Sequence, residues 1–368
     1  MPERIDFLLD LLNQRPSEEW TWRFEPEARE VSPINAVALC NAALLAYSPP
    51  DEVRRFLGKW GFDLATFRPL RRADTQGFVV RGPAGVVVAF RGTEPTNIAD
   101  WLSDVNYHRI KFGHLPGLIH GAFAKALDVV KDDFVNAVRE LADEGQPVWI
   151  TGHSLGGALA VLAAAVLKFE AGFDGITGTY TYGQPRVGDE EFCAGFKALL
   201  GDRLFRYVND QDIVPHVPPV ALAHLQLLRL PTLGRFSGFH LLKDPIAMLT
   251  RVAGEVADQI GDLASGETFS HIGLAKMLRA DGRLITDEKE AEAAWTERET
   301  PVGKSLQDVL RDLPSLLRES LNTRVLTGAR LTDHDPRHGY LPKLVLQVNA
   351  PDWRKCYPFT GPNLGRQA

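Results

Sequence analysis

Apolar residues recur along this chain with two different periods, and turns rich in glycine and proline separate the segments. Short runs of β-branched and aromatic residues predict strands at 77–81, 85–91, 147–151, 177–182 and 203–208. Longer segments with apolar residues every three or four positions predict helices at 34–47, 53–60, 124–142 and 156–170. Strands and helices that alternate in this way predict an α/β fold, in which a mostly parallel central sheet carries helices on both faces.

The junction between the strand at 147–151 and the helix at 156–170 carries the clearest chemical signal. Its residues, Gly152-His153-Ser154-Leu155-Gly156, fit the pattern G-x-S-x-G. A serine on a sharp strand-to-helix turn has a strained backbone and an exposed hydroxyl, and the flanking glycines let the chain turn without clashes. The backbone N–H of Leu155 lies at the positive end of the helix, where it can stabilise an oxyanion. The pattern is weak alone, but in this setting it indicates a nucleophilic serine.

A serine nucleophile needs a carboxylate and an imidazole further along the chain, in that order. Asp212 follows the strand at 203–208 and is the first candidate for the acid, with Asp210 as its alternative; Asp189 is expected to be structural. His334 and His338 lie in a polar turn before the last apolar segment, where a base carried by a loop is expected. Four other histidines are less well placed, either too close to the acid or beside an apolar insertion: His216, His224, His240 and His271.

The loop after the strand at 85–91 begins with Gly92-Thr93-Glu94, so Thr93 is placed to give the oxyanion a second backbone N–H. The segment at 96–105 then sets Ile98, Trp101 and Leu102 on one face of a short helix. One interpretation packs this face on the core. The other makes the helix a lid, which covers the site in water and turns its apolar face towards a lipid surface.

Composition narrows the function classes. A net charge of −6 does not suggest a nucleic-acid partner. The three cysteines, Cys40, Cys193 and Cys356, predict buried free thiols, and no metal site is expected at His334 and His338. The first residues do not form a signal peptide, which predicts a cytoplasmic protein or export by a non-standard route, and no apolar run is long enough to span a bilayer. Segments 220–268 and 287–325 are expected to be helical insertions in a single domain over 1–368.

Taken together, these segments resemble the class 3 lipases, the fungal-type branch of the α/β-hydrolases. The resemblance runs discontinuously from about residue 35 to 346, through VVVAFRGTE, NIADWLSDV, IHGAF, TGHSLGGALA, TYGQPRVGD, NDQDIVPHVPP, FSHIG and the Asp-His before Tyr340. It implies an α/β-hydrolase fold, to which the helical cap insertions expected here are additions. It also implies that Ser154 is the nucleophile, Asp212 the acid and His334 the base.

The same resemblance assigns the remaining site residues. Thr93 and Leu155 correspond to the oxyanion donors, and the helix at 96–105 to the lid. Tyr47 and His153 are expected beside the substrate, together with the lid residues Ile98, Trp101 and Leu102. The spacing between His334 and Tyr340 is one residue longer than in the family, which keeps His338 as a rival base. The long segment 220–268 is a second departure, and it can form a cap of its own.

The implied activity is hydrolysis of acylglycerols or other lipid esters through an acyl-enzyme, without a metal or organic cofactor. Contact with a lipid–water interface would be transient. A phospholipase or a short-chain or feruloyl esterase is the alternative within the hydrolases. A catalytically silent lipase-like scaffold that binds a ligand is the alternative from another class, and an intact set of serine, aspartate and histidine argues against it.

Overall fold

The structure is a computed structural model that describes residues 22–28, 30–93, 108–142, 145–209, 212, 214–216, 269–279, 282–287, 289–291, 293–294, 334–345 and 347–348. The expected lid helix at 96–105 lies outside the described residues, as do the segment 220–268 and most of 287–325. The same holds for Asp210, His224, His240 and Cys356. Among the helices that the structure does describe, none is both long and apolar enough to cross a membrane.

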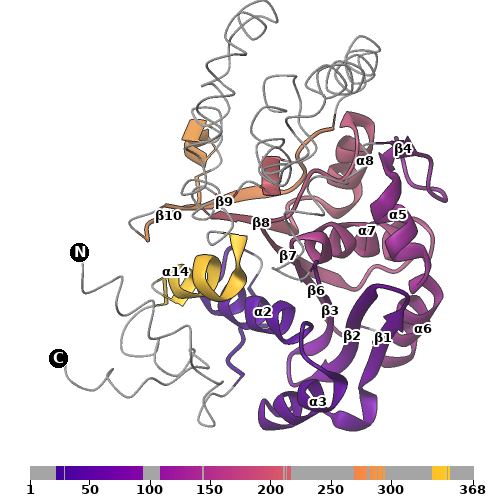
Figure 1. The fold of residues 1–368 in the computed structure, drawn as a ribbon, viewed down its shortest axis with the longest axis vertical. Helices are drawn as coiled ribbons and strands as arrows, with labels where there is room; N and C mark the ends of the chain where they lie inside the picture. The colour runs from indigo at the N-terminus through magenta and orange to yellow at the C-terminus, as the bar shows by residue number, and fades with distance from the viewer. Residues whose placement is uncertain are drawn as a thin grey trace, which may run out of the picture.

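An eight-stranded sheet forms the centre of the described fold, in the order β1-β2-β3-β6-β7-β8-β9-β10 (Figure 1). Strands β3, β6, β7, β8 and β9 are parallel to one another, whereas the strands at the two sides join in antiparallel fashion. The strands are β1 (Arg68–Arg72), β2 (Thr75–Gly82), β3 (Gly85–Phe90), β6 (Val148–His153), β7 (Ile176–Tyr182), β8 (Leu204–Asn209), β9 (Leu274–Leu278) and β10 (Leu284–Ile285). A separate pair contains β4 (Arg109–Ile110) and β5 (Ile119–His120).

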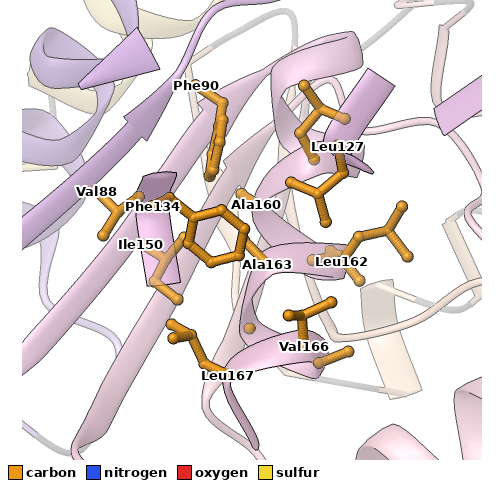
Figure 2. Close-up of a cluster of buried hydrophobic side chains, with 14 of the residues drawn as sticks. Val88, Phe90, Leu127, Phe134, Ile150, Ala160, Leu162, Ala163, Val166 and Leu167 are labelled. Atoms are coloured by element: carbon orange, nitrogen blue, oxygen red, sulfur yellow. The ribbon is translucent and has the colours of Figure 1, made fainter. Parts of the chain in front are cut away.

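Helices cover both faces of this sheet, and side chains alternate between the two faces along each central strand. On β6, Val148 and Ile150 join the apolar cluster beneath one set of helices, and Trp149 joins the cluster on the opposite face. The first set is α5 (Gly121–Asp128), α6 (Lys131–Leu141), α7 (Leu155–Phe169) and α8 (Glu190–Leu200), and the second is α2 (Pro33–Leu45), α3 (Pro50–Lys59) and α14 (Leu341–Val345). Figure 2 shows α7 packed on β3 and β6 through Ala160, Ala163 and Ile150. The predicted α/β-hydrolase sheet with helices on both faces is therefore confirmed.

The parallel pairing brings the carboxyl ends of four strands together, which is where an open α/β sheet builds its site. Phe90 at the end of β3 pairs with Gly152, and His153 at the end of β6 pairs with Tyr182 at the end of β7. Tyr182 in turn pairs with Tyr207 near the end of β8. The loops that carry Thr93, Ser154, Gly183 and Asp212 therefore leave the sheet side by side.

Several described elements were not among the sequence predictions, among them α8, β1, β4, β5, β9 and β10, and two of the differences have a clear physical reason. The helix expected at 124–142 is two helices, α5 and α6, with a break at Val129 and Val130. Two adjacent β-branched residues lower helix propensity, and Asp132 and Asp133 favour a new helix N-terminus directly after them. The break also lets Val130 be fully buried.

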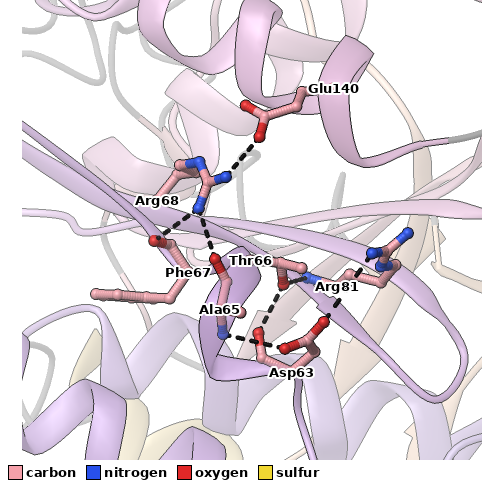
Figure 3. A network of polar contacts seen from close by, with 7 residues as sticks. All are labelled: Asp63, Ala65, Thr66, Phe67, Arg68, Arg81 and Glu140. Carbon is pink, nitrogen blue, oxygen red and sulfur yellow. Dashed lines mark hydrogen bonds and ion pairs between the residues drawn. The ribbon is translucent and has the colours of Figure 1, made fainter.

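The strand β1 was not predicted, because its sequence RPLRR carries only one large apolar side chain. An edge strand needs only one inward-facing residue, here Leu70, and it tolerates proline and charge. Figure 3 shows how a polar network holds this edge: Asp63 caps a short 3₁₀ turn (Leu64–Thr66), and Arg68 joins the carbonyl oxygen of Ala65 to the carboxylate of Glu140. These pairs are exposed, so they contribute to the local geometry more than to stability.

Candidate active site

Ser154 occupies the turn between β6 and α7 in a strained conformation. Its φ of 58° and ψ of −129° lie where non-glycine residues are rare, and among the described non-glycine residues only Ala73 shares a positive φ. Two main-chain hydrogen bonds hold this conformation. The Ser154 N–H donates to the Tyr182 carbonyl oxygen at 2.9 Å, and the Ser154 carbonyl oxygen accepts from the Gly157 N–H at 2.9 Å. The predicted sharp strand-to-helix turn is therefore present.

The two glycines of the motif are steric requirements of that turn. A Cβ on Gly152 would lie 2.0 Å from the Gly156 carbonyl oxygen, and a Cβ on Gly156 would lie 2.3 Å from the Phe90 carbonyl oxygen. Both distances are far below van der Waals contact, so α7 can begin this close to β3 and β6 only because neither residue has a side chain.

One expectation about Ser154 is wrong: its hydroxyl is not exposed. The residue is 0% exposed, and its Oγ has no hydrogen-bond partner among the described residues. The loop after β3 lies directly against it, because a Cβ on Gly92 would be 2.9 Å from the Ser154 Cβ and 2.5 Å from the Tyr47 hydroxyl. The local motif predicts the turn, but coverage by neighbouring loops depends on the rest of the fold.

Asp212 and His334 form a buried pair at the carboxyl end of β8. Both Oδ atoms of Asp212 lie 2.9 Å from His334 Nδ1, and both residues are 0% exposed. Burial by itself would raise the pKa of Asp212, but the His334 charge and hydrogen bonds from His334, Tyr340 and Val214 hold it below its ordinary value. Asp212 is therefore a carboxylate that accepts from Nδ1, which leaves Nε2 as the atom of His334 that can take up a proton.

The turn before α14 positions His334. The Tyr340 hydroxyl donates to Asp212 Oδ2 at 2.5 Å and accepts from the Asn209 N–H at 3.1 Å, while Lys343 Nζ donates to Asn209 Oδ1 at 2.5 Å. These bonds fasten the π-turn Pro336–Tyr340 and α14 to the end of β8. Tyr340 had no role among the sequence predictions. A general signal for it exists, because a tyrosine in an apolar segment has to find a partner for its hydroxyl.

The space beside His334 depends on the loop after β7. Gly183 has a φ of 60°, and a Cβ there would lie 2.8 Å from His334 Nδ1 and 2.8 Å from Asp212 Oδ2. This second residue was also missed, although a glycine directly after a strand is a recognisable signal for a close approach. Nε2 of His334 has no hydrogen-bond partner among the described residues, like Ser154 Oγ. A catalytic hydrogen bond that is long without substrate is common in such sites.

The structure places the remaining candidates in different ways. Leu155 is the first residue of α7, so its N–H has no intrahelical acceptor. Thr93 lies in the loop after β3, where its carbonyl oxygen is 3.5 Å from the Tyr47 hydroxyl. His338 lies in the π-turn before α14, and His216 ends a short 3₁₀ helix (Val214–His216). The lid residues Ile98, Trp101 and Leu102 lie outside the described residues.

Tyr47 and His153 contact each other, and both lie next to the pair just described. His153 is 0% exposed, with Nδ1 2.9 Å from the Tyr47 hydroxyl and Nε2 2.6 Å from the His334 carbonyl oxygen. Burial, together with the neighbouring His334, lowers the pKa of His153 to about 3. Burial also lowers the pKa of His120 to about 4, and this histidine caps α5 by accepting from the Ala122 N–H at 3.2 Å. His120 is thus structural, and so, as expected, is Asp189, which caps α8.

These two neutral histidines predict that acid destabilises the fold. In the unfolded chain a histidine has a pKa near 6.5, so as the pH falls the unfolded state takes up protons that His120 and His153 in the folded state do not. The free energy of unfolding should therefore decrease by roughly 3 kcal/mol between pH 7 and pH 5, as measured by urea unfolding. The contribution of Asp212, whose pKa is lowered, is lost only at more acidic pH.

A matched variant checks the source of this pH dependence. His120→Asn keeps a side-chain acceptor at the start of α5 but removes the titrating group, so it should reduce the loss of stability between pH 7 and pH 5 by about half. An unfolding free energy that is the same at both pH values in the unmodified protein would contradict the prediction.

Comparisons with known proteins find similarity to lipases. Residues 87–222 match the family model described as Lipase (class 3). A lipase of Rhizomucor miehei is 34% identical over 161 residues, covering 41% of this chain and 43% of the relative. Secreted mono- and diacylglycerol lipase 1 of Fusarium solani is 33% identical over 144 residues, covering 38% of this chain and 41% of the relative. The chain therefore spans less than half the length of either curated relative.

Solved structures carry related names. The structure of Rhizomucor miehei triacylglyceride lipase is 21% identical, covers 69% of this chain and 85% of its own, and has a TM-score of 0.45. A triacylglycerol lipase reported to have a serine protease triad as its catalytic centre is 26% identical, covers 50% of this chain and 74% of its own, and has a TM-score of 0.41. Because both scores are low, the fold assignment rests on the strand order and on the turn at Ser154.

Proposed function

We propose that the protein is a serine hydrolase of lipid carboxylesters, on the premise that residues 87–222 match the class 3 lipase family model. The observation that carries the proposal is the buried Asp212–His334 pair beside the strained turn of Ser154. These are the three residue types that turn a weak hydroxyl into a nucleophile, and they follow one another in the chain order of α/β-hydrolases.

In the proposed reaction, Ser154 Oγ attacks the ester carbonyl carbon while His334 Nε2 takes the hydroxyl proton. Asp212 holds Nδ1–H and stabilises the imidazolium that forms. The negative charge on the carbonyl oxygen is stabilised by the N–H groups of Leu155 and Thr93. His334 then gives its proton to the leaving alcohol, which leaves an acyl-enzyme. Water attacks the acyl group, with His334 again as the base, and the carboxylic acid is released from Ser154.

We propose acylglycerols as the substrate class, since the relatives are named as lipases, among them a mono- and diacylglycerol lipase. Complete burial of Ser154 and His334 means that a substrate reaches them only when a covering segment moves. We therefore propose that 96–105 is a lid. We also propose, from the sequence, that 220–268 and 287–325 are helical insertions of a single domain.

A substrate panel tests the proposed function. The panel contains triglycerides, phospholipids, short-chain esters and feruloyl esters, and the triglycerides should be hydrolysed fastest. The rate should rise once a triglyceride exceeds its solubility limit. A fluorophosphonate probe should label Ser154 covalently, as measured by mass spectrometry of the labelled peptide.

The alternatives give different outcomes. A preference for phospholipids or for aryl esters would reassign the substrate class without changing the mechanism. A smooth rise in rate through the solubility limit would favour an esterase without a lid. No turnover on any ester, together with no labelling of Ser154, would support a catalytically silent scaffold and contradict the proposal.

A further inference from the structure

His153 has two hydrogen bonds that the reaction at Ser154 leaves unexplained. It is the last residue of β6 and directly precedes Ser154, and it is fully buried. Its Nε2 lies 2.6 Å from the main-chain carbonyl oxygen of His334, and its Nδ1 lies 2.9 Å from the Tyr47 hydroxyl. The ring also packs on the imidazole of His334, with 4.5 Å between the centroids. Both nitrogens are thus bonded to protein groups and are not available to a substrate.

The chemistry of the partners determines which nitrogen of His153 carries the proton. A carbonyl oxygen can only accept, so Nε2 must carry the hydrogen that it donates to His334. Since burial keeps His153 neutral at ordinary pH, Nδ1 is then without a hydrogen and accepts from the Tyr47 hydroxyl. The direction of both bonds follows: Tyr47 donates to His153, and His153 donates to the main chain of His334.

This chain of bonds reaches the main chain of the base, which Asp212 does not contact. Asp212 contacts the imidazole of His334 at Nδ1, while Tyr340 and Lys343 fasten the turn and helix that follow. The carbonyl of His334 itself is bonded to the residue next to Ser154. The bond therefore joins the main chain of the base directly to the last residue of the strand that precedes the nucleophile, over a sequence separation of 181 residues.

We propose that His153 and Tyr47 are positioning residues that hold the main chain of His334 at the end of β6, and that they do not bind substrate. The inference rests on the proposed function, because it assigns the bonds a role only if His334 is the base. Loss of the tether would let the imidazole move relative to Ser154 Oγ. A displacement of about 1 Å at a reacting group can lower the rate about 100-fold without changing how substrate binds.

The test compares three variants on p-nitrophenyl esters of two chain lengths. His153→Leu keeps much of the volume but removes the donor, so kcat should fall about 10- to 100-fold while KM and the ratio of the two esters stay unchanged. His153→Gln can still donate to the His334 carbonyl and should recover most of the lost kcat. Tyr47→Phe should lower kcat in the same direction by a smaller factor, and it should add little when combined with His153→Leu.

Controls separate positioning from folding and from the proposed function. Tyr180→Phe also loses a buried tyrosine hydroxyl, but one near Ser32 and Asn35 at the start of α2, whereas Tyr47 follows the end of α2, so the kcat of this variant should match the unmodified enzyme. The rate of fluorophosphonate labelling should fall with kcat in His153→Leu. If that variant does not fold, Tyr47→Phe and the labelling rate still test the tether.

Three results would overturn the inference. A kcat within twofold of the unmodified enzyme in both His153→Leu and Tyr47→Phe would show that the tether has no role. A changed KM and ester ratio with kcat retained would make His153 part of the substrate site. A failure of His153→Gln to recover activity above His153→Leu would exclude the donated bond. The Ser154→Ala variant tests the proposed function separately. If it is inactive, the proposed function holds even when one of these three results overturns the inference. If it is active, the proposed function itself is excluded.

Discussion

Replacing Ser154 by alanine is expected to lower kcat for ester hydrolysis by about 10⁴- to 10⁶-fold, the largest effect of any single substitution in this chain. The loss follows because alanine has no hydroxyl to attack the carbonyl carbon, while the oxyanion donors at Leu155 and Thr93 remain. Since alanine keeps a Cβ, it also keeps the backbone strain at φ 58°, so the fold should melt close to the temperature of the unmodified protein. The measurement is kcat on a p-nitrophenyl acyl ester, with a thermal melt of each protein.

Ser48→Ala provides the matched control, because Ser48 lies in the turn after α2 and outside the strained strand-to-helix turn at Ser154. It should retain full activity and full labelling by the fluorophosphonate probe. Activity of Ser154→Ala within about tenfold of the unmodified enzyme would exclude Ser154 as the nucleophile, and it would remove the mechanism proposed above.

The second large effect separates the two late histidines. His334→Ala should lower kcat by about 10⁴-fold or more, because no other group replaces the imidazole bonded to Asp212. His338→Ala should keep kcat within a few-fold, since it is His334 whose Nδ1 meets the carboxylate. Both variants should be measured on the same ester at a pH where the unmodified enzyme is fully active.

The reverse pattern would transfer the role of the base. An inactive His338→Ala together with a nearly active His334→Ala would assign the base to His338 and leave the Asp212–His334 pair as a structural one. Loss of activity in both variants would call for melting curves, because a residue in the π-turn can also act through the docking of α14.

The elements that the sequence predicted well are those whose cause is local. The runs at β3, β6, β7 and β8 are rich in apolar and β-branched residues because both faces of each strand are buried. A buried strand needs such residue types, so it can be predicted from the sequence alone. The strand-to-helix turn at Ser154 also has a local cause. Gly152 and Gly156 are needed by atoms a few residues away and on the neighbouring strand, so the motif is readable without the fold.

The features that the sequence did not predict depend on the position of a residue in the tertiary structure. The strand β1 has a polar sequence that fits only the outermost place, where one face and one edge meet water. The break between α5 and α6 allows Val130 to be buried, and no local sequence pattern predicts that burial. Burial of Ser154 was missed because the loop after β3 covers it.

Residue order and type were therefore enough to predict a parallel α/β sheet, a nucleophilic serine on a strand-to-helix turn, and a short set of partners for it. They left His334 and His338 as rivals, and it was the family resemblance that placed Tyr47 and His153 beside the substrate. The fold distinguishes these residues because the docking of α14 on β8 sets which imidazole meets Asp212 and which carbonyl meets His153. Contacts between segments more than one hundred residues apart depend on packing and hydrogen bonds across the sheet, and no local pattern records them.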